Sequence, residues 1–178
     1  DAFVAPVPLQ KPRPRLWNGG RVTEALERTA RECDGWTTSF NEEPAELREK
    51  IAFYRSLPPS PHSLGREVVV LREGFCAATS QQARRLLEGP LLDLYRSYAS
   101  WKRGSIDAAR YQQLEWEALT SRMVVGSPEQ CIDQLAAYQA MGADGVVLRV
   151  QPPGLEHRDA MRCIELLGEK VLPAFRGG

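Results

Sequence analysis

Hydrophobic residues follow two different patterns along the chain. In some segments they form short continuous runs, and in others they recur three and four positions apart. Short runs of apolar or β-forming residues predict strands at residues 15–18, 34–40, 66–74 and 145–150. Apolar residues three and four positions apart predict the helices, at residues 23–32, 42–57, 79–87, 127–142 and 156–172. Strands that alternate with helices are typical of βαβ units, so the pattern predicts an α/β fold with a parallel sheet.

The boundaries of two predicted helices carry capping signals. Thr23 stands at the start of the first helix and is a candidate N-cap. Ser127 is a candidate N-cap for the helix before residue 142, where Pro128 suits the first helical position and Gln130 completes a capping box. Gly142 is expected to end that helix.

Four of the five predicted helices have an apolar stripe that is expected to face the core; the helix at residues 79–87 is given none. The stripes comprise Ala25, Leu26, Thr29 and Ala30; Leu47, Ile51 and Tyr54; Ile132, Leu135 and Ala136; and Met161, Ile164, Leu167 and Val171. The run Val68 to Leu71 is unbroken, which favours a strand covered on both faces. The aromatic-rich segment 91–124 is predicted to be helical with a break near Gly104.

Composition narrows the class of protein. The 178 residues suit a single domain over 1–178, and 43% apolar with 26% charged residues is typical of a soluble globular protein. Lys and Arg together number 23, as do Asp and Glu, which argues against a nucleic-acid partner. No apolar run is long enough for a membrane span, so we expect a cytoplasmic protein.

The first fourteen residues are proline-rich and are expected to form an extended lead-in. They lack an initiating Met and the order of a signal peptide, so we expect a cut into a longer chain or a processed product. The four cysteines are widely spaced and only two histidines are present, so we predict buried, reduced thiols and no metal site.

The most informative local pattern is the Gly19–Gly20 pair, which separates a predicted strand from a predicted helix. Main-chain N–H groups at such a turn meet the positive end of the helix dipole, and phosphate is the usual ligand there. Arg21 adds a positive charge and Thr23 a hydroxyl group. The dinucleotide fingerprint G-x-G-x-x-G is absent, which leaves an alternative open. In that alternative, the two glycines form a tight turn that needs a positive φ angle.

Three ordered stretches resemble the bacterial luciferase-like monooxygenases, a superfamily of flavin- and deazaflavin-dependent (β/α)8-barrel oxidoreductases. They are QKPRPRLWNGG…ALERTARECDGW, VGSPEQCIDQLAAYQAMGADGVVLR and LLGEKVLPAFR. The resemblance implies the C-terminal half of a TIM barrel, with the four predicted strands as the fifth to eighth barrel strands. It also implies reduced FMN or a deazaflavin coenzyme of the F-420 type as cofactor. A partner would then complete the barrel: an N-terminal half-barrel, another chain or a second copy.

By the same resemblance, the cofactor phosphate is held after the first predicted strand. The implied residues are Asn18, Gly19, Gly20, Arg21, Val22 and Thr23. One departure is Arg21, since family members often have a small residue or proline after the glycines, and its side chain could crowd or strengthen the site.

Substrate contacts are expected past the carboxyl ends of the strands, where barrel active sites lie. The candidates for a small-molecule substrate are Thr38, Arg149, His157 and Arg158, with a solvated loop as the alternative for the last two. Arg72 and Glu73 are expected to form a surface ion pair. The segment 88–126 is a candidate lid, or else its aromatic residues serve packing; these are Tyr95, Tyr98, Trp101, Tyr111 and Trp116.

No residue is a convincing general base, so the catalytic residues stay unassigned. The favoured function is a luciferase-like oxidoreductase or monooxygenase, or a portion of one. The alternatives are a non-catalytic half-barrel subunit that serves as a structural partner, and an unrelated phosphate-binding (β/α)8 enzyme such as a sugar-phosphate isomerase.

Overall fold

The computed structural model describes residues 5–101 and 114–176, which form an α/β fold around one parallel sheet. The strands are β1 (Trp17–Asn18), β2 (Gly35–Thr37), β3 (Glu67–Cys76), β4 (Val124–Gly126) and β5 (Gly145–Arg149). The helices are α1 (Thr23–Glu32), α2 (Pro44–Ser56), α3 (Ser80–Trp101), α5 (Trp116–Thr120), α6 (Pro128–Ala140) and α7 (His157–Leu166). A π-helical turn (Leu167–Val171) and a 3-10 turn (Leu172–Phe175) follow α7.

The ten-residue strand β3 organises the sheet, because three other strands pair with it. β2 lies along Glu67–Val69, β5 along Val69–Glu73 and β4 along Gly74–Cys76, all parallel to β3. β1 continues the sheet on the other side of β2. The predicted parallel α/β fold is therefore confirmed.

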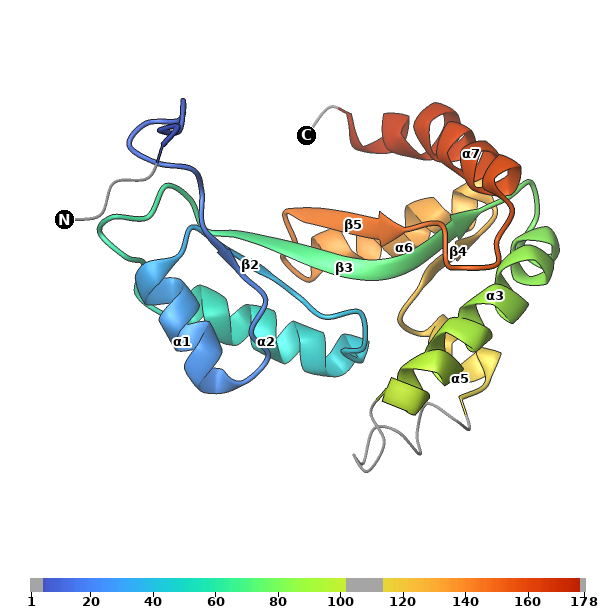
Figure 1. Cartoon of the computed structure of the whole chain (residues 1–178), viewed down its shortest axis with the longest axis horizontal. Helices are drawn as coiled ribbons and strands as arrows, with labels where there is room; N and C mark the ends of the chain where they lie inside the picture. Colours follow the sequence, from blue (N-terminus) through green and yellow to red (C-terminus); the bar gives the residue numbers. More distant parts are fainter. Residues whose placement is uncertain (1–4, 102–113, 177–178) are drawn as a thin grey trace.

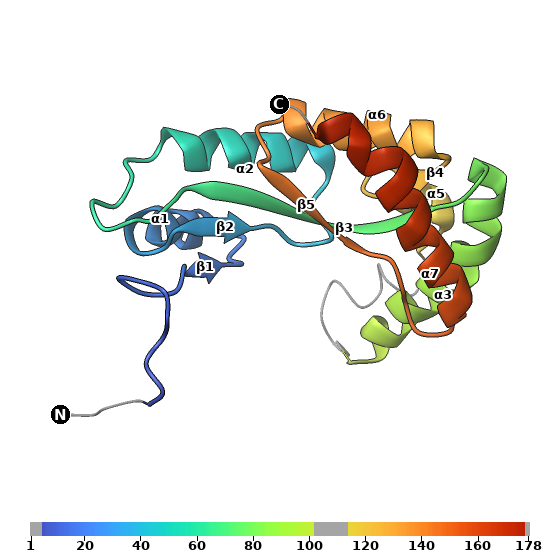
Figure 2. The ribbon, with the colours of Figure 1, turned by 90° about the horizontal axis from the view of Figure 1, so that it is seen from above.

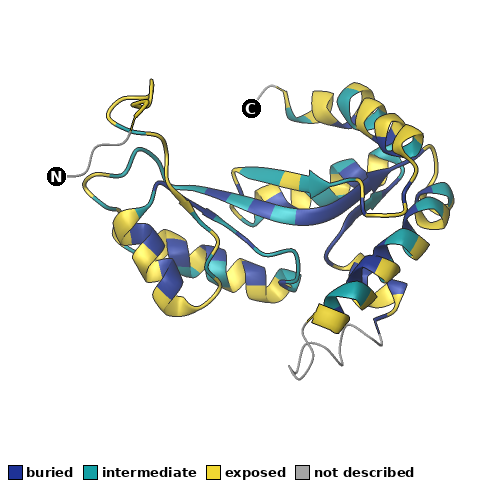
Figure 3. Ribbon diagram, viewed as in Figure 1, coloured by how far each residue is buried: buried dark blue, intermediate teal, exposed yellow. Residues whose placement is uncertain are grey.

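The helices divide into two groups along the sheet. Figure 1 shows α1 and α2 below β2, whereas α3 and α7 flank the carboxyl end of β3; Figure 2, in the rotated view, shows α1 beside β1 and β2. The stripes predicted on α1 and α2 are buried, and Trp36 of β2 packs against Tyr54 of α2 with ring centroids 5.8 Å apart. Burial is densest along β3, while β5 is only partly covered (Figure 3).

Two of the predicted helix boundaries are confirmed and one is wrong. Ser127 and Gln130 form the capping box of α6, and Gly142 follows that helix with a φ of +95°. Thr23 is the first residue of α1 and not its N-cap. Val22 takes the N-cap position with an extended backbone, and its apolar side chain makes no capping hydrogen bond.

Several predictions on the C-terminal half need correction. The pattern predicts Val124 and Val125 in the helical segment, but they form β4. The reason is that β3 extends to Cys76, and its last residues Gly74–Cys76 pair with β4. Ala136 is exposed, since α6 buries Cys131 and Tyr138 instead. α3 is continuous through Pro90, and the break expected near Gly104 lies outside the described residues.

The last helix also differs from its predicted form. It ends at Leu166, and the chain continues through the π and 3-10 turns, the second of which contains Pro173. Of its predicted stripe, Val171 is buried but Met161 and Ile164 are exposed. In the predicted two-face-covered run of β3, Val68 and Val70 are buried while Val69 and Leu71 are half-buried, so the second face is only partly covered; residues 72 to 76 are all buried.

Candidate functional site

The candidate site lies at the carboxyl edge of the sheet, where the turn after β1 meets the loop after β2. Parallel strands end at the same edge, and Asn18 pairs with Trp36, so the two connections start side by side. The indole Nε1 of Trp36 donates to the Gly20 carbonyl over 2.9 Å, which ties the turn to β2. The amide Nδ2 of Asn18 donates to the Thr29 hydroxyl over 2.7 Å and ties the same turn to α1.

Gly20 is required for close packing and not for an unusual backbone angle. A Cβ atom at Gly20 would lie 2.3 Å from the Cβ of Ala25 in α1, whereas one at Gly19 would meet only the Thr37 hydroxyl at 3.4 Å. Among the described glycines, positive φ angles occur at Gly126, Gly142 and Gly154. The alternative that the pair supplies a positive φ is therefore wrong.

The turn is open to solvent on its outer side. Gly19, Arg21, Val22 and Thr23 are exposed, and within residues 5–101 and 114–176 no side-chain capping hydrogen bond reaches the first N–H groups of α1. Uncapped N–H groups at a helix N-terminus attract anions, and Arg21 adds a full positive charge beside them. These residues fit a phosphate group, because the donors are unblocked and Gly20 leaves no side chain in the turn.

A buried carboxyl group, Glu42, lies next to this turn. Its Oε2 accepts a hydrogen bond from the Ser39 N–H over 2.7 Å, while its Oε1 has no hydrogen-bond partner among the residues that the structure describes. Two cations face Oε1 at longer range, Lys50 Nζ at 3.6 Å and Arg21 Nε at 3.9 Å. Burial raises the pKa of Glu42 above its ordinary value, although both cations act in the opposite direction.

Arg72 of β3 holds the loop after β2 through hydrogen bonds to its main chain. Its guanidinium donates to the carbonyls of Ser39 and Glu42 over 3.0 and 3.1 Å and to the Tyr138 hydroxyl over 2.8 Å. The side chain is fully buried. This loop is therefore positioned by a charged group from the centre of the sheet.

Glu73 pairs with Arg149 and not with its neighbour Arg72. Successive residues of a strand point to opposite faces, so Arg72 and Glu73 cannot meet, and both are buried. The predicted surface ion pair is wrong. Arg149 of β5 binds both carboxylate oxygens of Glu73, with Nε 2.9 Å from Oε2, since the two residues are register partners in adjacent strands.

Three aromatic side chains contact the Glu73–Arg149 pair. The Tyr95 hydroxyl donates to Glu73 over 3.1 Å, and Arg149 donates to the Tyr98 hydroxyl over 3.0 Å. The Arg149 guanidinium lies 4.5 Å from the ring centre of Phe40, in the loop after β2. Burial, together with the charge of Glu73, raises the pKa of Tyr95, which keeps its hydroxyl available as a donor.

The other predicted substrate residues are more scattered. Thr38 is buried, and its Oγ1 accepts from the Leu71 N–H over 3.0 Å. His157 and Arg158 are exposed on the first turn of α7. A substrate role stays a prediction for Thr38, Arg149, His157 and Arg158.

The predicted aromatic lid is only partly described. Tyr95, Tyr98 and Trp101 follow one another along α3 at ring distances of 5.9 and 5.4 Å, from buried to exposed. Trp116 of α5 is buried beneath Arg84 of α3, and Tyr111 lies outside the described residues. The lid stays a prediction.

Sequence reasoning missed the roles of Phe40, Glu42, Arg72 and Tyr95. The available signal was the pair of charged residues inside the apolar strand EVVVLREGFC, because burying a charge requires a partner. Within residues 5–101 and 114–176, no His, Cys, Asp and Glu side chains gather into a group that could hold a metal ion. None of the helices in these ranges combines the length and the apolar character of a membrane span.

Comparison with known proteins agrees with this architecture. The sequence model of a family described as luciferase-like monooxygenase matches residues 1–145. The oxygenase component of flavin-dependent trigonelline monooxygenase from Acinetobacter baylyi is 23% identical over 185 residues, which cover 96% of this chain and 51% of that protein. The chain thus spans about half the length of this curated relative.

Two solved structures show the same fold. The monooxygenase RslO1 from Streptomyces bottropensis superposes with a TM-score of 0.69 at 17% identity, over 96% of this chain and 51% of that one. The coenzyme F420-dependent tetrahydromethanopterin reductase from Methanopyrus kandleri gives 0.65 at 14% identity, over 91% and 51%. The sheet and its helices therefore correspond to about half of a luciferase-like TIM barrel.

Proposed function

Because the chain belongs to the luciferase-like monooxygenase family, we propose that it forms part of a flavin- or deazaflavin-dependent oxidoreductase whose cofactor phosphate binds at the Gly19–Gly20 turn. The observation that carries the proposal is the open, uncapped N-terminus of α1 beside Arg21, at the same sheet edge as the Glu73–Arg149 pair. Relatives of the chain are described as flavin-dependent or as coenzyme F420-dependent, which supports either reduced FMN or a deazaflavin.

In this proposal, the phosphate is bound by main-chain donors and one cation. The N–H groups of residues 20–23, the Thr23 hydroxyl and the Arg21 guanidinium surround it, and Asn18 keeps the turn against α1. Glu42 faces Nε of Arg21, so it limits where that guanidinium can lie. The bound cofactor supplies hydride transfer or oxygen activation, and the chain positions its phosphate end.

The substrate side lies toward Arg149 in this proposal. Its guanidinium is held by Glu73, Tyr98 and Phe40, and 28% of the side chain is exposed. A small molecule with a carbonyl or anionic group suits such a rigid, half-buried donor. His157 and Arg158 contribute further positive or polar groups from the start of α7.

We further propose that a second half-barrel completes the sheet: an N-terminal half-barrel, another chain or a second copy. Among the described residues, β1 pairs only with β2 and β5 only with β3, so each has a free edge. Val147 in β5 is 51% exposed. An apolar groove of about 1070 Å³ runs beside β5 and is lined in part by Val146, Leu148, Ile164 and Phe175. Free edges and exposed apolar groups favour association.

A comparison of FMN with riboflavin tests the phosphate site, because the two differ only in the phosphate. In anaerobic fluorescence titrations of the full chain, with the rest of the barrel supplied, reduced FMN or a deazaflavin coenzyme should bind at least about ten-fold more tightly than the form without phosphate. Arg21→Gln should remove most of this difference, and Gly20→Asp should abolish binding.

Arg28→Gln is the matched control, because Arg28 is exposed on α1 away from the turn. Equal affinity for FMN and riboflavin, or an unchanged preference in Arg21→Gln, would contradict the phosphate site. No binding of any coenzyme by the completed barrel would favour a non-catalytic structural subunit instead.

A further inference from the structure

A buried acid, Glu42, lies between the turn after β1 and the start of α2. None of its surface is exposed, although carboxylates are almost never fully buried unless they are paired. Its Oε2 accepts a hydrogen bond from the Ser39 N–H, whereas its Oε1 accepts none from any residue that the structure describes. A buried acceptor without a donor costs free energy, which points to a role for this side chain other than packing.

Three cations act on the Glu42 carboxyl group, and they are held with different firmness. Arg72 of β3 is buried and donates to main-chain carbonyls. Lys50 of α2 lies 3.6 Å from Oε1 and also donates to Glu46 over 2.6 Å. The Arg21 Nε lies 3.9 Å from Oε1, 48% of the Arg21 side chain is exposed, and Glu42 is its only ionic partner among the described residues. Arg21 is therefore the cation that can turn most easily toward another anion.

The same Arg21 stands beside the first N–H groups of α1, where we place the coenzyme phosphate. A phosphate there attracts the Arg21 guanidinium away from Glu42 and repels the buried carboxylate, and both interactions are strong where little water screens them. Each effect favours the protonated form of Glu42 over the charged form. Burial already raises the pKa of Glu42, so a modest further change is enough. Glu46 does not respond in this way, since 45% of its side chain is exposed to solvent.

We propose that Glu42 is a positioning residue, which holds the Arg21 guanidinium at the turn until a phosphate group binds it and which then takes up a proton. This role rests on the phosphate site proposed above and adds a coupled protonation to it. The proton comes from solvent and forms an O–H bond on one carboxylate oxygen, and no other covalent bond changes. Because the bound state then holds more protons, phosphate binding is stronger at lower pH.

Reduced FMN and reduced riboflavin isolate the contribution of the phosphate, because they share the same ring and differ only in that group. A phosphate monoester has a second pKa of about 6, so above pH 7 the free coenzyme is already doubly ionised. Any proton taken up with FMN in excess of riboflavin above that pH therefore belongs to the protein. Anaerobic titration calorimetry of the full chain, with the rest of the barrel supplied, counts these protons when it is run in two buffers of different ionisation enthalpy.

In the wild-type protein, FMN should take up about half a proton or more in excess of riboflavin at pH 7, and its advantage in affinity should fall at least about two-fold from pH 7 to pH 9. Difference infrared spectroscopy should show a new C=O stretch of a protonated carboxyl group when FMN binds. Glu42→Gln should still prefer FMN, but without the excess proton, without the new band and with a preference that is the same at both pH values. Circular dichroism checks that this variant folds.

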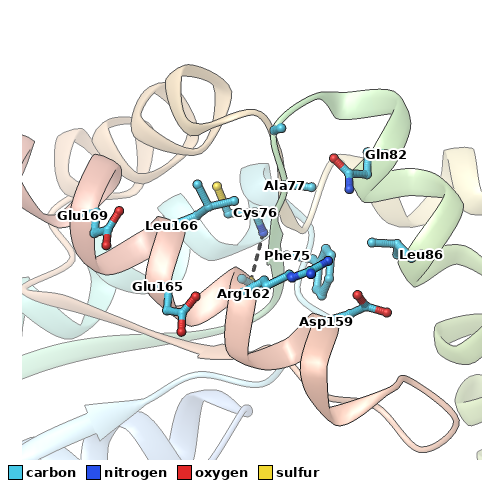
Figure 4. A pocket seen from close by; sticks show the side chains of 12 residues that line it. Phe75, Cys76, Ala77, Gln82, Leu86, Asp159, Arg162, Glu165, Leu166 and Glu169 are labelled. Carbon is cyan, nitrogen blue, oxygen red and sulfur yellow. Dashed lines mark hydrogen bonds between the residues drawn. The ribbon is translucent and has the colours of Figure 1, made fainter.

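Two exposed residues provide matched controls. Glu49→Gln removes a carboxylate from the exposed side of α2. Arg162→Gln removes a cation beside a separate cavity of about 290 Å³, where Figure 4 shows Arg162 on α7 together with Asp159 and Glu165. Both variants should keep the excess proton and the preference for FMN of the wild-type protein.

Failure of this proposal can be distinguished from failure of the phosphate site. A preference for FMN without an excess proton in the wild-type protein, or an excess proton that persists in Glu42→Gln, would overturn the role of Glu42 and leave the phosphate site in place. Equal affinity for FMN and riboflavin at every pH would overturn both. The wild-type proton count and infrared band need no variant, so they still decide whether a carboxyl group is protonated if Glu42→Gln does not fold.

Discussion

Replacing Gly20 with alanine tests why the turn after β1 needs glycine. The added methyl group would lie 2.3 Å from the Cβ of Ala25. Carbon atoms in contact prefer about 3.5–4.0 Å, so the start of α1 would have to move by about 1.2 Å or more. Ala25 is 7% exposed and packs against the core, which leaves little room for that movement.

The expected loss follows from this overlap. Overpacking of this kind destabilises a protein by about 1–3 kcal/mol. For a chain of this size, each kcal/mol lowers the melting temperature by about 2–4 °C. Differential scanning calorimetry or thermal circular dichroism of the full chain should therefore show a drop of about 2–12 °C in Gly20→Ala.

Three further variants make the reasoning refutable. In Gly19→Ala, the new Cβ meets only the Thr37 hydroxyl at 3.4 Å, so the stability should change by less than about 0.5 kcal/mol. Ala25→Gly alone should cost up to about 1 kcal/mol of helix propensity. In the double variant Gly20→Ala with Ala25→Gly, the overlap is gone, so the combined loss should be smaller than the sum. Equal melting temperatures for Gly19→Ala and Gly20→Ala, or additive losses in the double variant, would contradict the packing explanation.

Three other predictions concern buried polar groups. Asp34 accepts hydrogen bonds from Arg13 and from the N–H groups of Leu16 and Leu64, and the Arg13 hydrogen bond holds its pKa well below the ordinary value. The stabilisation that the Asp34 carboxylate provides is therefore complete above the unfolded pKa of about 3.9 and is lost as the pH falls toward the folded pKa. In urea denaturation, Asp34→Asn should have a lower free energy of unfolding than wild type at pH 7, and this difference should shrink at pH 3. Glu42 has a raised pKa, so its ionisation destabilises the fold above the unfolded pKa of about 4.3, and Glu42→Gln should gain stability relative to wild type as the pH rises from 4 to 7. Arg72→Met should cost about 2–4 kcal/mol in urea denaturation because it leaves the Ser39 and Glu42 carbonyls without donors, whereas Arg48→Met on the exposed side of α2 should change little.

Hydrophobic spacing alone determined most of the secondary structure. The strands β1, β2, β3 and β5 and the helices α1, α2 and α6 arise from local patterns, because burial of one face requires the same period wherever the element lies. The capping box at Ser127 is likewise local, since the interacting groups are three residues apart. The parallel sheet follows from the order of these elements.

The tertiary structure decided what the local patterns could not. β4 exists because β3 is long enough to pair with it, although Val124 and Val125 follow a helical segment. The Glu73–Arg149 pair, the Arg72 contacts with the loop after β2, and the hydrogen bond from the Cys76 N–H to the Cys163 sulfur each join residues at least 30 positions apart. Such contacts depend on strand register and on which face each side chain takes, and neither is encoded within a short window of sequence. The glycine pair at the turn after β1 could be recognised in the sequence. Its role could not, because Gly20 is needed for its close approach to Ala25, a contact that only the tertiary structure shows.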